Sequence, residues 1–443
     1  MSSIKPEDVH KVISKHMLPD VMGLVCDLKK SQGMYIYDSK NRVNYLDLFS
    51  FFATSPVGMN HPKMTTKEFK EKLGYVAVNK PSNSDVYTVE MAEFVETFSR
   101  IGIPEELPNL FLISGGALAV ENALKTAFDW KVRKNFEKGL KEEKGHKIIH
   151  FKQAFHGRTG YTLSMTNTFD PRKTKYFPKF NWPRIINPKI TFPINDENLK
   201  KVQELEQQSI DQINEVIEKE GDDIAGIIIE PIQGEGGDNH FRREFFQELR
   251  KIADENDILL IFDEVQTGVG LTGKMWAYEH FEVAPDIMAF GKKTQVCGIL
   301  CSNRIKKVKN NVFEEASRIN STWGGNLVDM VRFQKYLEII DEENLIENAE
   351  KMGNYFLNKL NNLQDNFKEK ISNIRGRGLM IAFDLPTTEK RDQIRKKLYE
   401  NKVLSLPCGS NSIRFRPPLI IEEKHIDEAI NILHKSLKEI LSD

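Results

Sequence analysis

The feature that most constrains the fold is a strand–helix–strand pattern in the middle of this 443-residue chain. Ala225–Ile229 and Ile258–Phe262 are short, almost wholly apolar runs, as expected for strands that are covered on both faces. Between them, residues 241–253 place apolar side chains at helical spacing. Similar runs occur at Leu110–Ile113 and Lys147–Phe151. The alternation predicts an α/β fold with a mostly parallel central sheet flanked by helices.

The two ends of the chain predict a second, smaller unit. Two short alternating runs within residues 1–75 are joined by a polar turn, which is typical of a β-hairpin. Residues 328–443 change to an α+β pattern, which opens with one long predicted helix near 328–361. Because an isolated two-stranded hairpin is marginally stable, we expect the N-terminal segment to complete the C-terminal α+β domain. Residues 76–327 then form the large domain.

Composition excludes several classes of function. The chain has 63 Lys and Arg against 64 Asp and Glu, so net charge does not recruit nucleic acid or a membrane. Its four cysteines lack zinc-ribbon or CxxC spacing, which predicts no metal site and fits a reducing compartment. The N-terminus lacks the apolar stretch of a signal peptide, and no run has the length of a membrane span. We therefore expect a cytoplasmic protein.

A carboxylate and a lysine each follow an apolar run. Asp263 comes directly after Ile258–Phe262, and Lys292 lies in a turn that follows Pro285–Gly291. These groups are what an enzyme needs to hold pyridoxal phosphate: the lysine forms a Schiff base, and the acid keeps the pyridine nitrogen protonated. Taken singly, Asp263 is more often a strand-end cap and either lysine a surface lysine, and it is the preceding Pro285–Gly291 segment that favours Lys292. The adjacent Lys293 leaves open which lysine is modified.

Three further motifs have weaker local signals. Ser114–Ala117 joins an apolar run to a helix, so its small residues and the helix N-terminus suit a phosphate, although such turns are common. Phe155 either stacks on a flat ring or closes the core. Gly268–Met275 almost matches a P-loop, but Met275 replaces the Ser or Thr that binds magnesium. We therefore reject an ATP site there.

Together these segments resemble the class III aminotransferases of fold type I, over nearly the whole chain and in the same order. The matching motifs are Asn60–Pro62, Ser114–Lys125, Phe155–Arg158, Glu230–Gly237, Asp263–Gly268, Lys292, Thr322–Asn326 and Arg414–Pro418. Leu118 and Leu271 depart from the wider class pattern. Within the class, the segments 114–118 and 291–298 are similar to those of lysine ε-aminotransferases. The resemblance implies a large pyridoxal-phosphate-binding domain and a smaller α+β domain.

The resemblance also implies the cofactor contacts. Lys292 would carry the cofactor, Asp263 would pair with its ring nitrogen, and Gln266 would reach its phenolic oxygen. Phe155 and Val265 would lie on either side of the ring. The remaining implied contacts are to the phosphate and come from Gly116, Ala117 and Thr322. Thr322 would come from the other subunit, which implies a homodimer with shared active sites.

The implied substrates are L-lysine and 2-oxoglutarate, with glutamate and 2-aminoadipate 6-semialdehyde as products. The implied substrate-binding residues are Arg158, Glu235, Gln266, Asn320 and Arg414. An arginine fork pairs bidentately with a carboxylate, so Arg158 and Arg414 are suited to bind the substrates' acid groups. When lysine is bound, Arg414 has no carboxylate near the ring. We hypothesise that Glu235 neutralises it then and swings away for 2-oxoglutarate.

Three alternatives remain. Ornithine, 4-aminobutyrate or diaminobutyrate aminotransferases would share the same cofactor residues and differ in pocket length. An aminomutase would keep the cofactor and need no second oxo acid. A non-catalytic binding protein would keep only the shape, and the presence of Lys292, Asp263 and the arginines argues against it.

Overall fold

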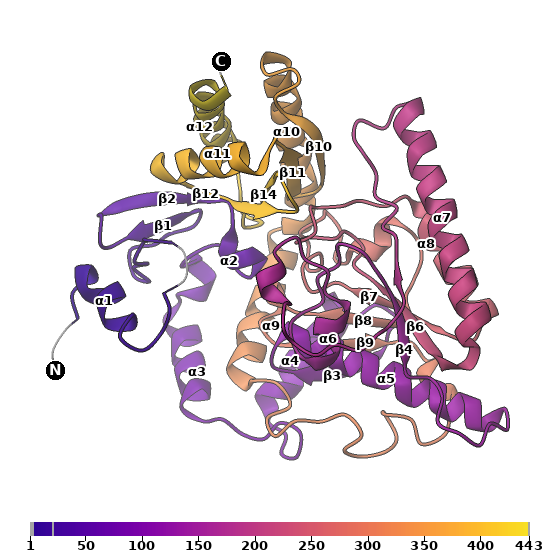
Figure 1. Cartoon of the computed structure of the whole chain (residues 1–443). Coiled ribbons are helices and arrows are strands. Elements are labelled where there is room, and N and C mark those ends of the chain that lie inside the picture. The colour runs from indigo at the N-terminus through magenta and orange to yellow at the C-terminus, as the bar shows by residue number, and fades with distance from the viewer. Residues whose placement is uncertain (1–3, 20–21, 442–443) are drawn as a thin grey trace.

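A seven-stranded sheet forms the centre of the molecule, in the order β3-β9-β8-β7-β6-β4-β5. The computed structural model describes residues 4–19 and 22–441 (Figure 1). Neighbouring strands from β8 to β5 pair in parallel, and β9 is antiparallel to both β8 and β3. The strands are β3 (Asn109–Ile113), β4 (Lys147–Phe151), β5 (Arg184–Ile185), β6 (Ile224–Ile229), β7 (Leu259–Asp263), β8 (Ile287–Phe290) and β9 (Cys297–Cys301). The predicted mostly parallel sheet is confirmed.

Helices cover both faces of this sheet, which explains why its central strands are mostly apolar. Along β7, Leu259 and Ile261 join the hydrophobic cluster under α5 (Gly116–Glu137). Leu260 and Phe262 join the opposite cluster, under α8 (Arg243–Glu255). Side chains alternate between the faces of a strand, so two covered faces favour a nearly continuous run of apolar residues. The other helices of this part are α3 (Lys67–Val78), α4 (Val89–Ile101), α6 (Gly160–Met165), α7 (Asp196–Glu220) and α9 (Leu327–Glu342).

Two smaller sheets lie beside the large one, under the C-terminal helices at the top of Figure 1. An antiparallel sheet has the order β10-β11-β14-β13. The N-terminal hairpin β1–β2 is present, and β2 pairs in parallel with β12 from the C-terminal part. The division of the chain near residues 75 and 327 stays a prediction. The elements are β1 (Tyr35–Asp38), β2 (Val43–Asp47), β10 (Ser372–Arg377), β11 (Met380–Asp384), β12 (Val403–Leu404), β13 (Leu406–Cys408), β14 (Ser412–Phe415), α1 (Val9–Ile13), α2 (Ser50–Ala53), α10 (Leu345–Asn366), α11 (Thr388–Glu400) and α12 (Glu423–Leu441).

The prediction of a single long helix near 328–361 is wrong. The chain forms two helices there, because Asn344 adopts a left-handed conformation with φ 51° between α9 and α10. Asparagine tolerates this conformation better than most residues. Apolar residues continue at helical spacing on both sides of the break, so periodicity alone did not reveal it. The two helices pack on different partners, α9 on α3 and α4, and α10 on β10 and α12.

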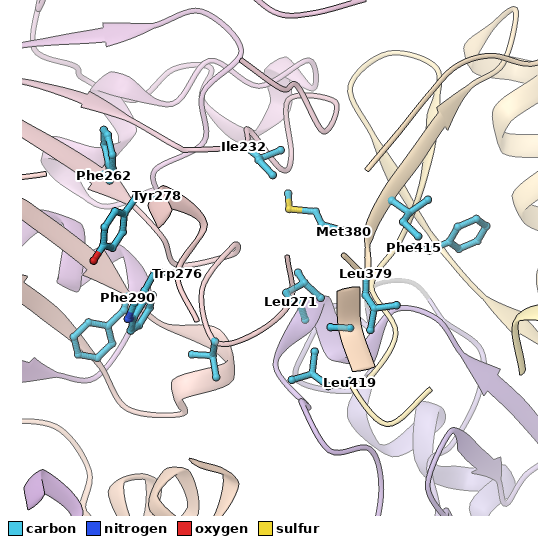
Figure 2. Close-up of a cluster of buried hydrophobic side chains, with 14 of the residues drawn as sticks. Ile232, Phe262, Leu271, Trp276, Tyr278, Phe290, Leu379, Met380, Phe415 and Leu419 are labelled. Carbon is cyan, nitrogen blue, oxygen red and sulfur yellow. The ribbon is translucent and has the colours of Figure 1, made fainter. Parts of the chain in front are cut away.

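The hydrophobic core runs without interruption from the large sheet into the C-terminal sheet. Figure 2 shows Phe262 and Phe290 on the side of the large sheet and Phe415 on the other, with Leu271 between them. The Leu379 amide donates to the Leu271 carbonyl at 2.8 Å. The P-loop-like segment therefore joins the two parts of the protein. Among the described residues, no helix is both long enough and apolar enough to cross a membrane.

Candidate active site

A cavity of about 450 Å³ lies where the carboxyl ends of the central strands meet. Asp263 is the last residue of β7, Glu230 follows β6, and Lys292 lies in the turn after β8. Ligand sites of open α/β sheets are expected at this edge. The cavity is lined by Gly116, Ala117, Phe155, His156, Gly157, Arg158, Thr159, Glu230, Asp263, Val265, Gln266 and Lys292. Every predicted cofactor contact except Thr322 is among them.

Asp263 is held by a histidine to which the sequence analysis assigned no role. His156 Nδ1 lies 2.8 Å from Asp263 Oδ2, and both side chains are buried. The Val265 amide donates to the other carboxylate oxygen at 3.1 Å. Burial opposes protonation of His156, yet the Asp263 carboxylate raises the pKa of the histidine above its ordinary value. The only sequence signal for His156 was its place in the motif that begins at Phe155.

Glu230 is a second buried acid that sequence reasoning left without a role. Its Oε1 accepts from the Phe155 amide at 2.9 Å, and its Oε2 accepts from the Gly234 amide at 3.0 Å. Burial raises the pKa of Glu230 to about 7. The carboxyl group therefore ties two loops to the end of β6 and fixes the start of the segment that carries Phe155.

The two adjacent lysines have different surroundings. Lys292 lines the cavity, and burial lowers the pKa of its amine while Asp263 opposes this effect. Lys293 is buried, and its Nζ donates to the Gln266 carbonyl at 2.8 Å and to the Ala53 carbonyl at 3.5 Å. Burial also lowers the pKa of the Lys293 amine, so both amines tend toward the neutral nucleophile that a Schiff base requires, and only the Lys292 amine borders the cavity. Geometry therefore favours Lys292 as the attachment site.

Glycines bring the start of α5 against the loop that follows Phe155. Gly157 has φ 123°, and a Cβ atom there would lie 2.6 Å from the Cβ of Ala117. At Gly116, the first residue of α5, a Cβ atom would lie 3.0 Å from a Val265 methyl group. The first amides of a helix have no partners within it, and the helix dipole favours anions at this end. The 22-residue helix thus presents donors suited to a phosphate.

Arg414 and Glu235 have separate partners. Arg414 is buried, and its Nη1 donates to Gln266 Oε1 at 3.0 Å. Glu235 Oε1 accepts from Thr168 Oγ1 and from Lys173 Nζ, each at 2.6 Å. The pair between Glu235 and Arg414 is therefore not formed in this structure, and the switch between them stays a hypothesis.

Asn320 and Thr322 lie outside this chain's own cavity. Both are exposed on the segment that precedes α9, and the Thr322 carbonyl accepts from Ser82 Oγ at 2.5 Å. Arg158, in contrast, is an exposed residue of the cavity lining. The exposed position of Thr322 is compatible with a contact to the site of another subunit. The homodimer and both residue roles stay predictions.

The groups around the cavity fit pyridoxal phosphate. The amine of Lys292 can bind an aldehyde, the buried Asp263 can pair with a pyridine nitrogen, and the α5 N-terminus can hold a phosphate. These three groups border one cavity.

Comparison with known proteins shows the family of this chain. Residues 18–437 match the family Aminotransferase class-III. The L-lysine-epsilon aminotransferase of Mycobacterium tuberculosis is 50% identical over 433 residues, which are 98% of this chain and 96% of that protein. The enzyme of the same name from Streptomyces clavuligerus is 46% identical over 444 residues, 99% of this chain and 96% of that protein.

A solved structure of lysine aminotransferase from M. tuberculosis in the internal aldimine form has the same fold. It superposes with a TM-score of 0.96 at 49% sequence identity, and the match covers 99% of this chain and 100% of that chain. The chain therefore belongs to the class III aminotransferases, which depend on pyridoxal phosphate.

Proposed function

We propose that this enzyme transfers the ε-amino group of L-lysine to 2-oxoglutarate. The products are glutamate and 2-aminoadipate 6-semialdehyde, which cyclises to 1-piperideine-6-carboxylate. The observation that carries the proposal is the 46–50% identity, along almost the full length, to proteins named L-lysine-epsilon aminotransferase.

Pyridoxal phosphate, when bound, stores the amino group between the two half-reactions and withdraws electrons from the reacting carbon. Lys292 would hold the cofactor and move the proton at that carbon. Asp263 would pair with the ring nitrogen, and His156 would orient it through the 2.8 Å contact. Phe155 and Val265, which line the cavity, would fix the plane of the ring. Each role matches the position of the side chain around the cavity.

Two arginines are suited to the carboxylates of the substrates. Arg414 is buried, and its Nε has no hydrogen-bond partner among the described residues, so this N–H can donate to a carboxylate of a substrate. Arg158 lies at the exposed side of the cavity lining. 2-Oxoglutarate carries two carboxylates and would use both arginines. Lysine carries one, remote from the reacting amine, and would use Arg158.

The proposed assembly is a cytoplasmic homodimer. Asn320 and Thr322 are exposed and lie outside the cavity lining of their own chain, which supports a role across a subunit interface. Thr322 would complete the phosphate site of the partner, and Asn320 its substrate site.

Isotope transfer tests the proposed reaction. The holoenzyme is incubated with 2-oxoglutarate and lysine that carries heavy nitrogen only at the ε position, and glutamate is analysed by mass spectrometry. We expect labelled glutamate. Unlabelled glutamate would mean that the α-amine is transferred and that the substrate orientation is wrong. If no glutamate forms, the proposed substrate is wrong, and ornithine, 4-aminobutyrate and diaminobutyrate are the next amines to test.

A further inference from the structure

The side-chain amide of Gln266 lies between two guanidinium groups. Its Oε1 accepts from Arg414 Nη1 at 3.0 Å and from Arg416 Nε and Nη2, each at 3.2 Å. An arginine side chain has donors only, so the amide atom that faces two of them must be the oxygen. The amide nitrogen therefore points to the other side, and Gln266 lines the cavity.

Arg416 is held by contacts along its side chain and its main chain. Its side chain is fully buried and forms an ion pair with Asp238, which is also fully buried. Its Nη1 donates to the Phe415 carbonyl at 2.7 Å, and its main-chain amide donates to the Leu48 carbonyl at 2.7 Å. A guanidinium with this many fixed contacts keeps its direction when ligands enter or leave.

The rest of Gln266 is equally confined. Lys293 Nζ donates to its main-chain carbonyl at 2.8 Å. Its side-chain amide lies against Gly234, where a Cβ atom would be 2.4 Å from the amide nitrogen and oxygen. A glycine at this place lets the amide lie flat beside the loop that also carries Asp238. Arg416 and Lys293 thus hold the two ends of one residue.

We propose that Arg416, anchored by Asp238, is a positioning residue that keeps the Gln266 amide nitrogen directed at the phenolic oxygen of pyridoxal phosphate. The inference rests on the proposed contact between Gln266 and the cofactor. Arg414 also holds the amide oxygen, but in the proposed function it binds a carboxylate of 2-oxoglutarate. Arg416 is not among the residues that line the cavity and would stay in place, so the amide would keep its direction in both half-reactions.

The orientation matters because the phenolic oxygen carries negative charge in the bound cofactor. An amide N–H donor stabilises this charge, whereas a reversed amide would place a lone pair against it. Loss of the orientation should therefore weaken cofactor binding. It should also raise the pH at which the absorption of the bound cofactor changes, because an anionic oxygen without a donor holds a proton more tightly.

The test compares Arg416→Lys and Arg416→Gln with the wild-type enzyme in the absence of lysine. Apoenzyme is titrated with pyridoxal phosphate, and the absorption of the holoenzyme is followed against pH with and without glutarate. Glutarate is a dicarboxylate without an oxo group and would engage Arg414. We expect roughly tenfold weaker cofactor binding. With glutarate present, we expect the absorption of the bound cofactor to change with a midpoint about one pH unit above that of the wild type.

The matched control is Arg375→Lys. Arg375 is also buried and donates to the carbonyls of Gly237 and Asp238, but its contacts do not include Gln266. In the Arg375→Lys variant, the midpoint of the absorption change with pH should equal that of the wild type. Arg416→Lys keeps the positive charge beside Asp238, so it carries the test if Arg416→Gln does not fold.

A double-mutant cycle assigns the effect to the amide. In a Gln266→Leu background, Arg416→Lys should cause no further shift of the midpoint. The proposal is overturned if Arg416→Lys leaves the midpoint unchanged with glutarate bound, or if the same shift appears in the Gln266→Leu background. Because these measurements use no amine substrate, they are independent of whether label passes from lysine to glutamate.

Discussion

Replacing Glu264 by glutamine should change how the stability of the apoenzyme depends on pH. Glu264 is fully buried directly after Asp263. Its Oε1 accepts from the Tyr278 amide at 2.8 Å, and its Oε2 accepts from the Thr267 hydroxyl. Burial raises the pKa of Glu264 to about 7, from an ordinary value of 4.5.

A raised pKa means that the folded protein binds more protons than the unfolded chain between pH 4.5 and 7. Stability therefore falls as pH rises through this window, and the full loss is reached near pH 8. The shift corresponds to about 3 kcal/mol in the free energy of unfolding. A glutamine keeps an acceptor for the Tyr278 amide and stays neutral. We expect Glu264→Gln to be more stable than wild type at pH 8 and equal to it near pH 4.5.

Thermal unfolding of the apoenzyme between pH 5 and 8.5, followed by circular dichroism, measures this effect. For a chain of this length, about 3 kcal/mol corresponds to a difference of roughly 3 °C in Tm at pH 8. Glu218→Gln on the exposed side of α7 is the matched control and should follow the wild type. A difference in Tm between Glu264→Gln and wild type that stays constant with pH would refute the reasoning.

Three other perturbations test the site. Lys292→Ala should abolish covalent attachment of the cofactor and Lys293→Ala should retain it, because Lys292 and not Lys293 lines the cavity. Borohydride reduction followed by peptide mass spectrometry identifies the modified lysine, and a cofactor attached to Lys293 would contradict this prediction. Gly157→Ala should weaken cofactor binding roughly tenfold, because the new Cβ would lie 2.6 Å from that of Ala117 at φ 123°; wild-type affinity in a titration of the apoenzyme would contradict this. Glu235→Ala should raise kcat/KM for α-amino donors relative to lysine, and an unchanged ratio would argue against its proposed switch.

Some of the site was accessible from local sequence. Asp263 ends a strand whose residues are all buried, and Lys292 lies two residues after another such strand, so the apolar runs marked both residues as candidates. The choice between Lys292 and Lys293 was different. The two lysines are adjacent in the chain, and only the fold shows that one amine borders the cavity while the other donates to the Gln266 carbonyl.

The sequence by itself determined the mostly parallel sheet and the order of the motifs, because strands covered on both faces are nearly continuous apolar runs. It did not reveal the break at Asn344, since helical spacing continues on both sides. Only the tertiary structure brought His156 to Asp263 and Arg416 to Gln266, across 107 and 150 residues. Such contacts depend on how the carboxyl ends of separate strands converge in space. A local sequence pattern contains no information about which distant residues meet there.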